Sequence, residues 1–338
     1  MKTITLTETE IANLASEALE RAGASRTSAR SLSDAIAAAE RDGIPSHGLA
    51  YLPTYCLHLT CGKVDPAAIP RVESNHSVVR VDAAHGFAHP AIDVGFDALV
   101  PLAREHGIAA LAITRSYNCG VLSFHTERLA RAGLVGLGFT NAPASIAGWG
   151  GRKPVLGTNP WSLAVPDASG GVAFLIDQSA SVVAKSEVMK HQREGRTIPD
   201  TWALDAEGVP TTDPNVALKG SMAPAGGYKG VGSALLVETF AALLTGSLPG
   251  VEAAPFSGPA GGPPGVGQFF IAVDPRKTSG GHFAERLATL VLAFDQSTGT
   301  RLPGERRFAN RRRSADGGIE VDQRIFEAAL ALARPSAP

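Results

Sequence analysis

From about residue 70 onwards, short runs rich in β-branched residues alternate with longer amphipathic runs. The strand-like runs include HSVVRVDA, IAALAITRS and LVGLGFTN, and the helix-like runs HPAIDVGFDALVPLAREHG and LSFHTERLARAG separate them. Strand runs that alternate with helical runs are typical of α/β and mixed α+β domains. The alternation therefore predicts a sheet domain of the α/β (mixed α+β) class.

The first sixty residues have the pattern of helices. Thr7 and Glu10 have the spacing of a capping box, and apolar residues at helical spacing follow them. A second amphipathic run covers roughly 27–41, and a third is expected to begin near His47. We therefore expect three helices before the sheet, and a last helix over 321–333.

The composition excludes several classes of protein. The 338 residues carry a formal net charge of -1, which argues against a nucleic-acid-binding surface. No apolar run approaches the ~20 residues of a membrane span, and the polar N-terminus does not resemble a signal peptide. Three cysteines are too few, and odd in number, for a disulfide framework. We therefore expect a cytoplasmic protein with reduced thiols.

The glycine pattern that binds a dinucleotide in Rossmann folds, G-x-G-x-x-G after a strand, is absent. The glycines of GLVGLGFTN have the wrong spacing, and Leu235 follows Gly230 and Gly232 where the third glycine would stand. A dinucleotide, if one is used, is therefore not bound by a Rossmann turn. The Pro/Gly-rich stretch 254–267 is expected to be a loop or a lid.

The triplet Ser46-His47-Gly48 is the first candidate for chemistry. A histidine titrates near neutral pH and can pass a proton to a developing alkoxide or nitrogen anion. Ser46 could orient the ring or cap a helix. The alternative is a surface histidine beside a capped helix, and the triplet by itself does not decide between them.

Two further stretches place polar groups where a small ligand could bind. Thr158 lies in the turn of VLGTNPWSLAVP and offers a hydroxyl to a carboxylate, although such a turn is often only a turn. Asp177 ends a strand, where an acidic residue commonly meets a ribose hydroxyl. Glu187 lies about three turns further on and could orient a histidine, or simply face solvent.

Two cationic stretches have the chemistry of anion sites. GGYKG (226–230) places Lys229 at the front of a helix behind a tight glycine turn, which suits a phosphate or carboxylate. RLPGERR (301–307) places three arginines around a Pro-Gly turn, a natural anion clamp. Both stretches are also compatible with ordinary solvated cations.

A metal site and a serine hydrolase site are not expected. Cys56, His58 and Cys61 are close together, but their spacing fits no familiar zinc pattern and no second ligand pair follows. There is no G-x-S-x-G stretch, so the nucleophile turn of α/β-hydrolases is absent.

In their order and spacing, RDGIPSHGLAYLPTY, GTNPWSLAVP, IDQSAS, GGYKG and LPGERR resemble the malate/L-lactate dehydrogenase family, which lacks a Rossmann fold. The resemblance covers about residues 10–330. Within the family, the entry to the SHG triplet, REGRTIP and RLPGERR look most like the Δ1-piperideine-2-carboxylate/Δ1-pyrroline-2-carboxylate reductases. These ketimine reductases convert cyclic imino acids to L-pipecolate or L-proline with NADPH.

The resemblance implies a role for each candidate residue. His47 would be the proton donor, with Ser46 and Glu187 as its charge-relay partners. Tyr51 would contact the substrate and Thr158 would bind its carboxylate. The residues that would line the cofactor are Asn118, Cys119, Gly120, Val121, Leu122, Asp177, Gln178, Ser179, Tyr228, Lys229, Arg301, Leu302, Pro303, Gly304, Glu305, Arg306 and Arg307.

The resemblance also implies how the chain is organised. Residues 1–65 would form a helical segment that packs with a C-terminal helix at 320–335. Residues 66–120 and 250–320 would form the substrate and dimerisation part, and 121–249 the NAD(P)-binding part. A homodimer with its active site near the subunit interface is expected, without metal. The expected cofactor is NADPH, with NADH possible.

Three positions depart from the family pattern. Many members carry arginine where Tyr51 stands, and that change removes a charged hydrogen bond of ~1.5–3 kcal/mol from the grip on a carboxylate. Some relatives have histidine and an aromatic residue at Asn118 and Cys119, and others have aspartate at Glu187. These departures concern the substrate more than the type of reaction.

We therefore expect NADPH-dependent reduction of a cyclic imino acid, with hydride delivered to C2 and the proton supplied by His47. One alternative is a 2-hydroxyacid dehydrogenase of the malate, L-lactate or ureidoglycolate type, acting on an open-chain substrate with the same residues. The other is a catalytically silent relative that only binds nucleotide.

Overall fold

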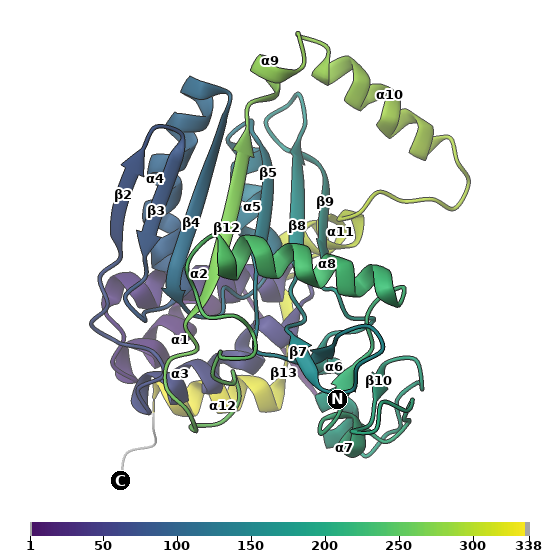
Figure 1. The fold of residues 1–338 in the computed structure, drawn as a ribbon. Coiled ribbons are helices and arrows are strands. Elements are labelled where there is room, and N and C mark those ends of the chain that lie inside the picture. The colour runs from purple at the N-terminus through teal and green to yellow at the C-terminus, as the bar shows by residue number, and fades with distance from the viewer. Residues whose placement is uncertain (1, 335–338) are drawn as a thin grey trace.

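The centre of the computed structural model, which describes residues 2–334, is a seven-stranded mixed sheet (Figure 1). Only the neighbours β3 and β4 in this sheet run parallel, and every other pair is antiparallel. The α/β (mixed α+β) prediction is thereby confirmed. In their order across the sheet, the strands are β2 (Arg71–Asn75), β3 (Val78–Asp82), β4 (Ile108–Ser116), β12 (Val266–Val273), β5 (Val135–Thr140), β8 (Trp161–Pro166) and β9 (Val172–Gln178).

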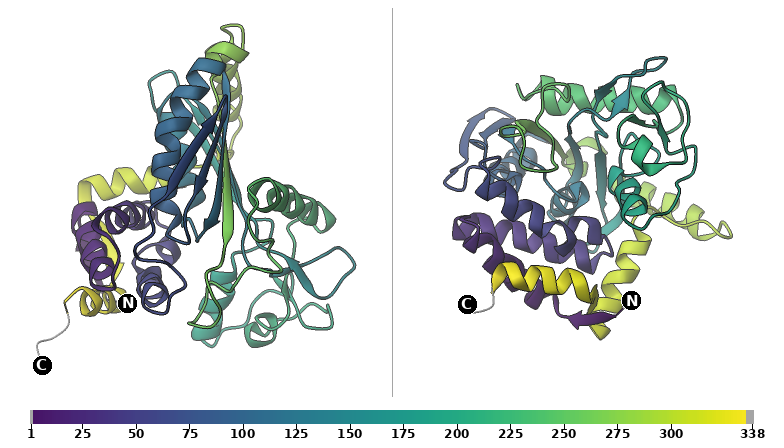
Figure 2. Two further views of the ribbon diagram at one scale, coloured as in Figure 1. Left: turned by 60° about the vertical axis from the view of Figure 1, so that its left-hand side comes forward. Right: turned by 90° about the horizontal axis from the view of Figure 1, so that it is seen from below.

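Helices cover both faces of this sheet (Figure 2). The long helix α4 (Ala88–His106) and α5 (Leu122–Arg131) pack on one face, where Phe270 of β12 is fully buried. The other face is covered by α8 (Tyr228–Glu238) and its π-helical continuation η3 (Thr239–Leu243). Burial on both faces explains why the central strands are apolar along most of their length.

The two ends of the chain meet in a helical layer beside the sheet (Figure 2). The N-terminal capping box is present, because Thr7 and Glu10 each accept the other's backbone N–H. One apolar core joins all members of the layer, and β1 pairs antiparallel with β13. The members are β1 (Thr3–Leu6), α1 (Glu8–Arg21), α2 (Arg26–Arg41), α3 (Leu52–Thr60), β13 (Ile319–Asp322) and α12 (Gln323–Ala333).

A smaller four-stranded sheet forms a satellite beneath α8 (Figure 1). Its core is built from Ile146, Val188 and Met222, so it has an apolar centre of its own. Its strands are β10 (Ala203–Leu204), β11 (Ser221–Met222), β6 (Ile146–Ala147) and β7 (Pro154–Leu156), with α6 (Lys185–Arg193) and α7 (Pro214–Ala217) beside them.

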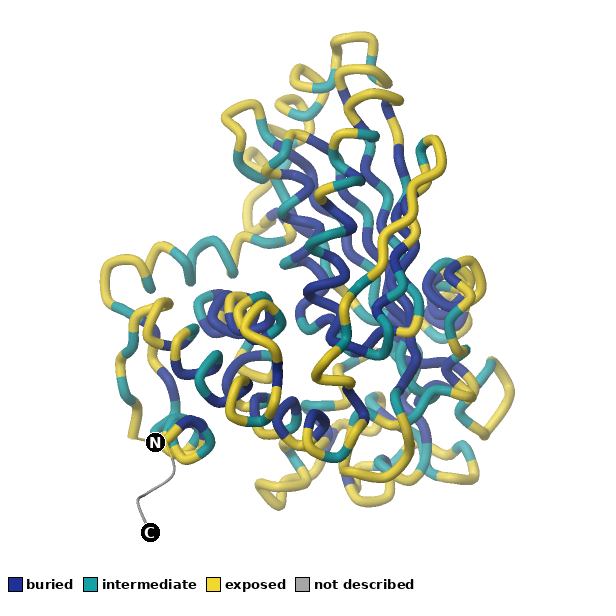
Figure 3. Tube along the Cα trace, turned by 90° about the vertical axis from the view of Figure 1, so that its left-hand side faces the viewer, coloured by how far each residue is buried: buried dark blue, intermediate teal, exposed yellow. Residues whose placement is uncertain are grey.

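A helical arm follows the last strand of the main sheet. After the short α9 (Pro275–Thr278), helix α10 (Phe283–Asp295) projects from the body (Figure 1) and contains no buried residue. The buried residues of the chain gather instead along the central sheet and the helices beside it (Figure 3). The chain then returns through α11 (Glu305–Gly317), which lies against α2. An apolar helix that buries nothing in its own chain has an unpartnered face.

The prediction that a helix begins near His47 is wrong, because the α-helix begins later in the chain. Residues 45–47 and 49–51 form two 3-10 turns, η1 (Pro45–His47) and η2 (Leu49–Tyr51), and the α-helix begins only at Leu52. Gly48 lies between the turns with φ −92° and ψ −143°, and this extended backbone prevents one continuous helix. His47 therefore lies on an irregular connection, as many functional residues do.

The structure also bears on the expected loop, the cysteines and the absence of a membrane span. Residues 254–265 of the Pro/Gly-rich stretch form a loop, as predicted, and β12 begins at Val266. The three cysteines are free thiols. Within residues 2–334, no helix combines the length and the apolar character needed to cross a membrane. The division into substrate and cofactor parts stays a prediction.

Candidate active site

His47 is half-buried at the end of the first 3-10 turn. The hydroxyl oxygen of Ser46 lies 3.1 Å from its ring nitrogen Nδ1, within hydrogen-bond distance. The serine therefore holds the ring from one side and leaves Nε2 as the nitrogen that can exchange a proton with another molecule.

The surroundings of His47 favour the neutral imidazole. Burial lowers the pKa of His47 from its ordinary value, the negative charge of Asp177 raises it, and the positive charge of Arg307 lowers it. The net direction is downwards, so most rings are uncharged near neutral pH and can accept a proton. The carboxylate that acts on His47 in this chain is therefore Asp177.

Asp177, the last residue but one of β9, lies at the beginning of α5. Its Oδ2 accepts the backbone N–H of Ser123 at 3.0 Å, and the Arg307 guanidinium donates to the same oxygen at 3.3 Å. Arg307 also donates to the Ser123 hydroxyl. The strand end, the helix start and α11 are thus joined at one carboxylate, next to His47.

Glu187 lies elsewhere, in the first turn of α6. Its carboxylate is 3.6 Å from the Lys190 ammonium and 3.7 Å from the His191 ring, and its side chain is 38% exposed. Within the described residues it forms no hydrogen bond or ion pair with His47. Within one chain, Ser46 and His47 therefore lie together, whereas Glu187, the expected third member of the charge relay, lies apart from them.

Tyr51, one turn after His47, points into an aromatic cluster. Its hydroxyl donates to the backbone carbonyl of Phe256 at 3.2 Å, and its ring packs edge-on against Tyr55 at 4.8 Å. Burial raises the pKa of Tyr51, and hydrogen bonding with Tyr117 and Asn118 lowers it in part. The hydroxyl is therefore neutral, and it belongs to an uncharged, largely aromatic wall.

The loop at 254–258 is fastened to this wall through its backbone carbonyls. Lys63 Nζ donates to Pro255 O at 2.5 Å, and His58 Nε2 donates to Gly258 O at 3.0 Å. Burial lowers the pKa of His58, which keeps the ring neutral, so the Tyr117 hydroxyl can donate to Nδ1 at 2.5 Å. Together with Tyr51, these donors hold the expected loop or lid closed against the helical layer.

Thr158 lies in a turn that a buried amide holds in place. Asn159 has a positive φ of 39°, and its side chain donates to Ala234 O at 2.9 Å and to Glu238 at 2.6 Å. Glu238 in turn accepts the Gly250 N–H at 2.6 Å. The Thr158 hydroxyl makes no hydrogen bond to any residue of 2–334, so it is free to bind a ligand.

The stretch 118–122 forms a tight turn that leads into α5. The Asn118 side chain accepts the Gly120 N–H at 2.6 Å, and Gly120 has the positive φ (67°) that such a turn requires. Burial raises the pKa of the Cys119 thiol to about 12, so this thiol is inert. Val121 then places Leu122 at the helix start, where the Ser123 N–H already donates to the Asp177 carboxylate.

The glycine turn at 226–227 and the start of α8 form an anion cradle. Gly226 and Gly227 both have positive φ (66°), and Lys229 is exposed in the first turn of the helix. Tyr228 is 62% exposed and packs edge-on against Trp149. The start of α8 therefore offers main-chain amides and the positive end of a helix dipole, with an exposed lysine in its first turn.

The arginines of 301–307 divide into two kinds. Arg301 and Arg306 are exposed and form no ion pair within residues 2–334, whereas Arg307 binds Asp177. The turn itself is part of the scaffold, because Glu305 accepts the Leu302 N–H and Pro303 O accepts the Leu175 N–H. Gly304 (φ 98°) starts α11. Gln178 and Ser179 complete the set of predicted cofactor residues, directly after Asp177.

Sequence patterns missed the charged network that anchors the stretch before His47. Arg311 of α11 binds the carboxylates of Asp42 and Glu127, and Arg41 pairs with Asp42 and with Glu8. Only the acidic and basic composition of RDG and RRR hinted at these pairs. Within residues 2–334, no group of three or more His, Cys, Asp or Glu residues could hold a metal ion.

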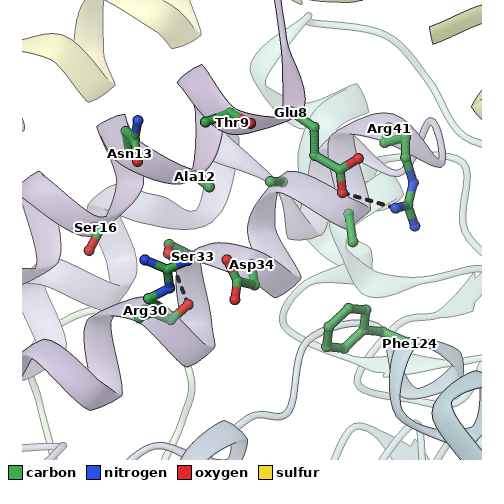
Figure 4. A pocket seen from close by; sticks show the side chains of 12 residues that line it. Glu8, Thr9, Ala12, Asn13, Ser16, Arg30, Ser33, Asp34, Arg41 and Phe124 are labelled. Atoms are coloured by element: carbon green, nitrogen blue, oxygen red, sulfur yellow. Dashed lines mark hydrogen bonds and ion pairs between the residues drawn. The ribbon is translucent and has the colours of Figure 1, made fainter. Parts of the chain in front are cut away.

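A separate groove of about 280 Å³ lies between α1 and α2 (Figure 4). Glu8, Asp34, Arg41 and Phe124 are among its lining residues, and the Glu8–Arg41 pair closes one end at 2.9 Å. Burial raises the pKa of Asp34. None of the predicted site residues lines this groove, so it is distinct from the site at His47.

A neutral, half-buried histidine, a threonine hydroxyl without a partner within residues 2–334 and a glycine turn that can cradle an anion are groups that suit an oxidoreductase, which moves a hydride and a proton. The comparisons with known proteins agree with this class. The malate/L-lactate dehydrogenase model matches residues 6–329, and the chain belongs to this family, as its motifs predicted.

The names of the similar proteins point to different substrates. A (2R)-3-sulfolactate dehydrogenase (NADP(+)) of Chromohalobacter salexigens is 46% identical over 98% of both chains. A Δ1-pyrroline-2-carboxylate/Δ1-piperideine-2-carboxylate reductase of Pseudomonas aeruginosa is 37% identical over 97% of this chain and 99% of that one. The crystal structure of a Δ1-piperideine-2-carboxylate reductase from Pseudomonas syringae pv. tomato superposes with a TM-score of 0.92. It is 36% identical and covers 98% of this chain and 100% of that chain.

Proposed function

We propose that this dehydrogenase oxidises the C2 hydroxyl of a small open-chain 2-hydroxy acid with NADP+, and that 3-sulfolactate is its first candidate substrate. The identity of 46% with the sulfolactate dehydrogenase, against 36–38% for the reductases that act on cyclic imino acids, supports this choice. The lowered pKa of His47 supports the direction of oxidation, because a neutral imidazole is ready to accept the hydroxyl proton.

His47 performs the proton transfer in this proposal. Its Nε2 takes the proton from the substrate hydroxyl, while Ser46 holds Nδ1. When bound, the oxidised nicotinamide supplies the acceptor for the hydride that leaves C2. In the reverse direction the imidazolium returns the proton to oxygen. The charge of Asp177 stabilises this imidazolium without touching the substrate.

We assign the carboxylate of the substrate to Thr158, and Tyr51 to a further substrate contact. The Thr158 hydroxyl has no partner within residues 2–334, and Asn159 and Glu238 hold its turn rigid. The Tyr51 hydroxyl already donates to Phe256 O, so it can only accept a further hydrogen bond or change partner. A grip that depends on a neutral hydroxyl is weaker than one with an arginine.

The residues fit an NADP cofactor. The turn at 226–227 has the open backbone of an anion cradle, with Lys229 exposed in the helical turn that follows, and Arg301 and Arg306 are exposed cations of the 301–307 stretch. A free 2'-phosphate needs such cations, which favours NADP(H) over NAD(H). Arg307 is not assigned to the cofactor, because Asp177 and Ser123 already bind it.

Reduction of cyclic imino acids by NADPH is the second candidate function. The superposition with the Δ1-piperideine-2-carboxylate reductase supports it, as does the neutral, aromatic wall at Tyr51, whose ring packs against the buried Tyr55. Ring methylenes fit such a wall well, whereas a sulfonate requires a cation or several donors. In this reaction a protonated His47 would donate to the ring nitrogen.

A substrate panel tests both candidates. With NADP+ we expect the highest kcat/KM for 3-sulfolactate, followed by malate and lactate, and with NADPH a lower value for Δ1-piperideine-2-carboxylate and Δ1-pyrroline-2-carboxylate. A higher kcat/KM for either cyclic imine reverses the order of the candidates. No turnover of any substrate, with NADPH still binding in a fluorescence titration, identifies a silent nucleotide-binding relative. A titration with NADH in parallel tests the choice of cofactor.

We further propose that the enzyme is a homodimer. Leu235 of α8, Leu243 of η3 and Leu244 directly after it are 52%, 65% and 57% exposed, and α10 buries none of its apolar residues. A cleft of about 1160 Å³ separates α10 from the end of the main sheet. Apolar surface of this extent in a soluble enzyme usually marks a protein interface, and a second copy of the chain is the proposed occupant.

A further inference from the structure

Glu40 is a buried acid at the end of α2, within one turn of the stretch that carries His47. Its side chain has one hydrogen-bond partner within residues 2–334, the backbone N–H of Leu49, which donates to Oε1 at 2.7 Å. It forms no ion pair in this part of the chain. Burial raises the pKa of Glu40, and the bond from Leu49 lowers it in part. A buried carboxylate without a cation is costly, so its retention suggests a purpose.

Gly48 is the residue against which the Glu40 carboxylate packs. A Cβ at position 48 would lie 2.2 Å from Glu40 Oε1 and 2.5 Å from its carboxyl carbon. The backbone of Gly48, with φ −92° and ψ −143°, does not itself require glycine. The glycine of the SHG triplet is therefore explained by the close approach of the Glu40 carboxylate.

We propose that Glu40 is the positioning residue of the His47 turn: its carboxylate fixes the backbone of Gly48 and Leu49 and thereby the direction of the imidazole. The inference rests on the proposed role of His47 as the proton-transfer residue. Ser46 orients the ring at Nδ1, and Glu40 orients the main chain that bears the ring. Glu40 acts through His47 and touches neither substrate nor cofactor.

Four variants test the role of Glu40, with steady-state kinetics and NADPH affinity as readouts. Glu40→Ala removes the acceptor, and we expect kcat to fall at least ~10-fold, because a misplacement of about 1 Å can cost 10²-fold. Glu40→Gln keeps an acceptor oxygen of the same shape and should stay within about 3-fold of the wild type. Gly48→Ala displaces the carboxylate from the other side, should reproduce the loss, and serves if Glu40→Ala does not fold.

The double variant Glu40→Ala/His47→Ala distinguishes positioning from a general structural role. If Glu40 acts through His47, the double variant has the kcat of His47→Ala alone, and NADPH affinity stays within about 2-fold throughout. A further loss of kcat in the His47→Ala background overturns the inference, as does an unchanged kcat in Glu40→Ala or an equal loss in Glu40→Gln. An unchanged kcat in His47→Ala instead overturns the proposed function itself.

Discussion

The guanidinium of Arg311 forms two hydrogen bonds with the carboxylate of Asp42, at 2.7 and 2.6 Å. The same guanidinium forms two more with Glu127, at 2.5 and 2.6 Å. Burial alone would raise the pKa of Glu127, but the hydrogen bonds from Arg311 and Arg131 bring it below the ordinary value. One arginine of α11 thus joins α5 to the residue that lies five positions before His47.

Removal of this arginine should destabilise the fold. Arg311→Met removes the cation that two largely buried carboxylates share and leaves Asp42 with Arg41 alone and Glu127 with Arg131 alone, so we expect the free energy of unfolding to fall by about 3 kcal/mol. Urea denaturation measures the change. Arg312→Met is the matched control, because Arg312 is exposed and forms no ion pair within residues 2–334, and it should cost less than about 0.5 kcal/mol. Equal losses in the two variants would show that the network contributes nothing specific.

Replacement of His47 should remove most of the activity and none of the cofactor binding. We expect His47→Ala to lower kcat at least ~100-fold, the usual scale for a general acid or base. Ser46→Ala removes only the contact to Nδ1 and should cost about 10-fold or less, since one hydrogen bond contributes about 1 kcal/mol. Turnover with the favoured substrate and an NADPH titration measure the two effects. A His47→Ala enzyme with wild-type kcat contradicts the mechanism.

The sequence predicted those parts of the molecule that depend on local pattern. β4 and β8 have the bounds expected from IAALAITRS and WSLAVP, and the capping box at Thr7 is present, because each depends on neighbours in the chain. The two-residue strands of the satellite sheet were missed, since two residues are too few to show a period. β1 and β13 pair across opposite ends of the chain, and no local pattern records such a pairing.

The candidate site likewise contains residues that a local pattern predicts and others that only the three-dimensional structure reveals. Ser46, His47 and Thr158 could be predicted as candidates because a polar residue stands out in a turn or beside a strand. The sequence could not decide which carboxylate acts on His47, because the answer depends on how β9 and α6 lie in space. In this chain Asp177 acts on the ring, and Glu187 pairs with Lys190. Glu40 looked like any polar residue at a helix end, and only its burial distinguishes it.

The pH dependence of the reaction should follow the charge of Asp177. This charge raises the pKa of His47, so Asp177→Asn should lower the pKa further, while the amide oxygen can still accept the Ser123 N–H. Oxidation needs the neutral ring, so its rate rises with pH through the His47 pKa. We expect this limb to move to lower pH in the variant. Asp167→Asn, at the far end of the β8–β9 hairpin, should leave the profile unchanged, and an unmoved limb in Asp177→Asn excludes the proposed electrostatic link.

The hydroxyl of Tyr51 should affect substrate binding more than turnover. Tyr51→Phe removes the donor to Phe256 O and frees the loop at 254–258 from one of its three fastenings. We expect KM to rise about 3- to 10-fold and kcat to change less than about 2-fold, the scale of one hydrogen bond. Tyr55→Phe is the control, because the Tyr55 hydroxyl makes no hydrogen bond within residues 2–334. A fall in kcat without a change in KM would place Tyr51 in the chemical step instead.

The exposed apolar residues of α10 and of η3 should determine the oligomeric state. A charge buried in a protein interface without a partner costs several kcal/mol, so Leu290→Asp and Leu243→Asp should each shift the enzyme towards the monomer. Both side chains are exposed in the single chain, at 47% and 65%, so neither change should unfold it. Ile69→Asp is the control, because Ile69 is 77% exposed on a loop outside both faces. Light scattering over a dilution series measures the molecular mass in solution. We expect twice the monomer mass for the wild type and the control, and the monomer mass for the two variants. A monomeric wild type would contradict the proposed homodimer.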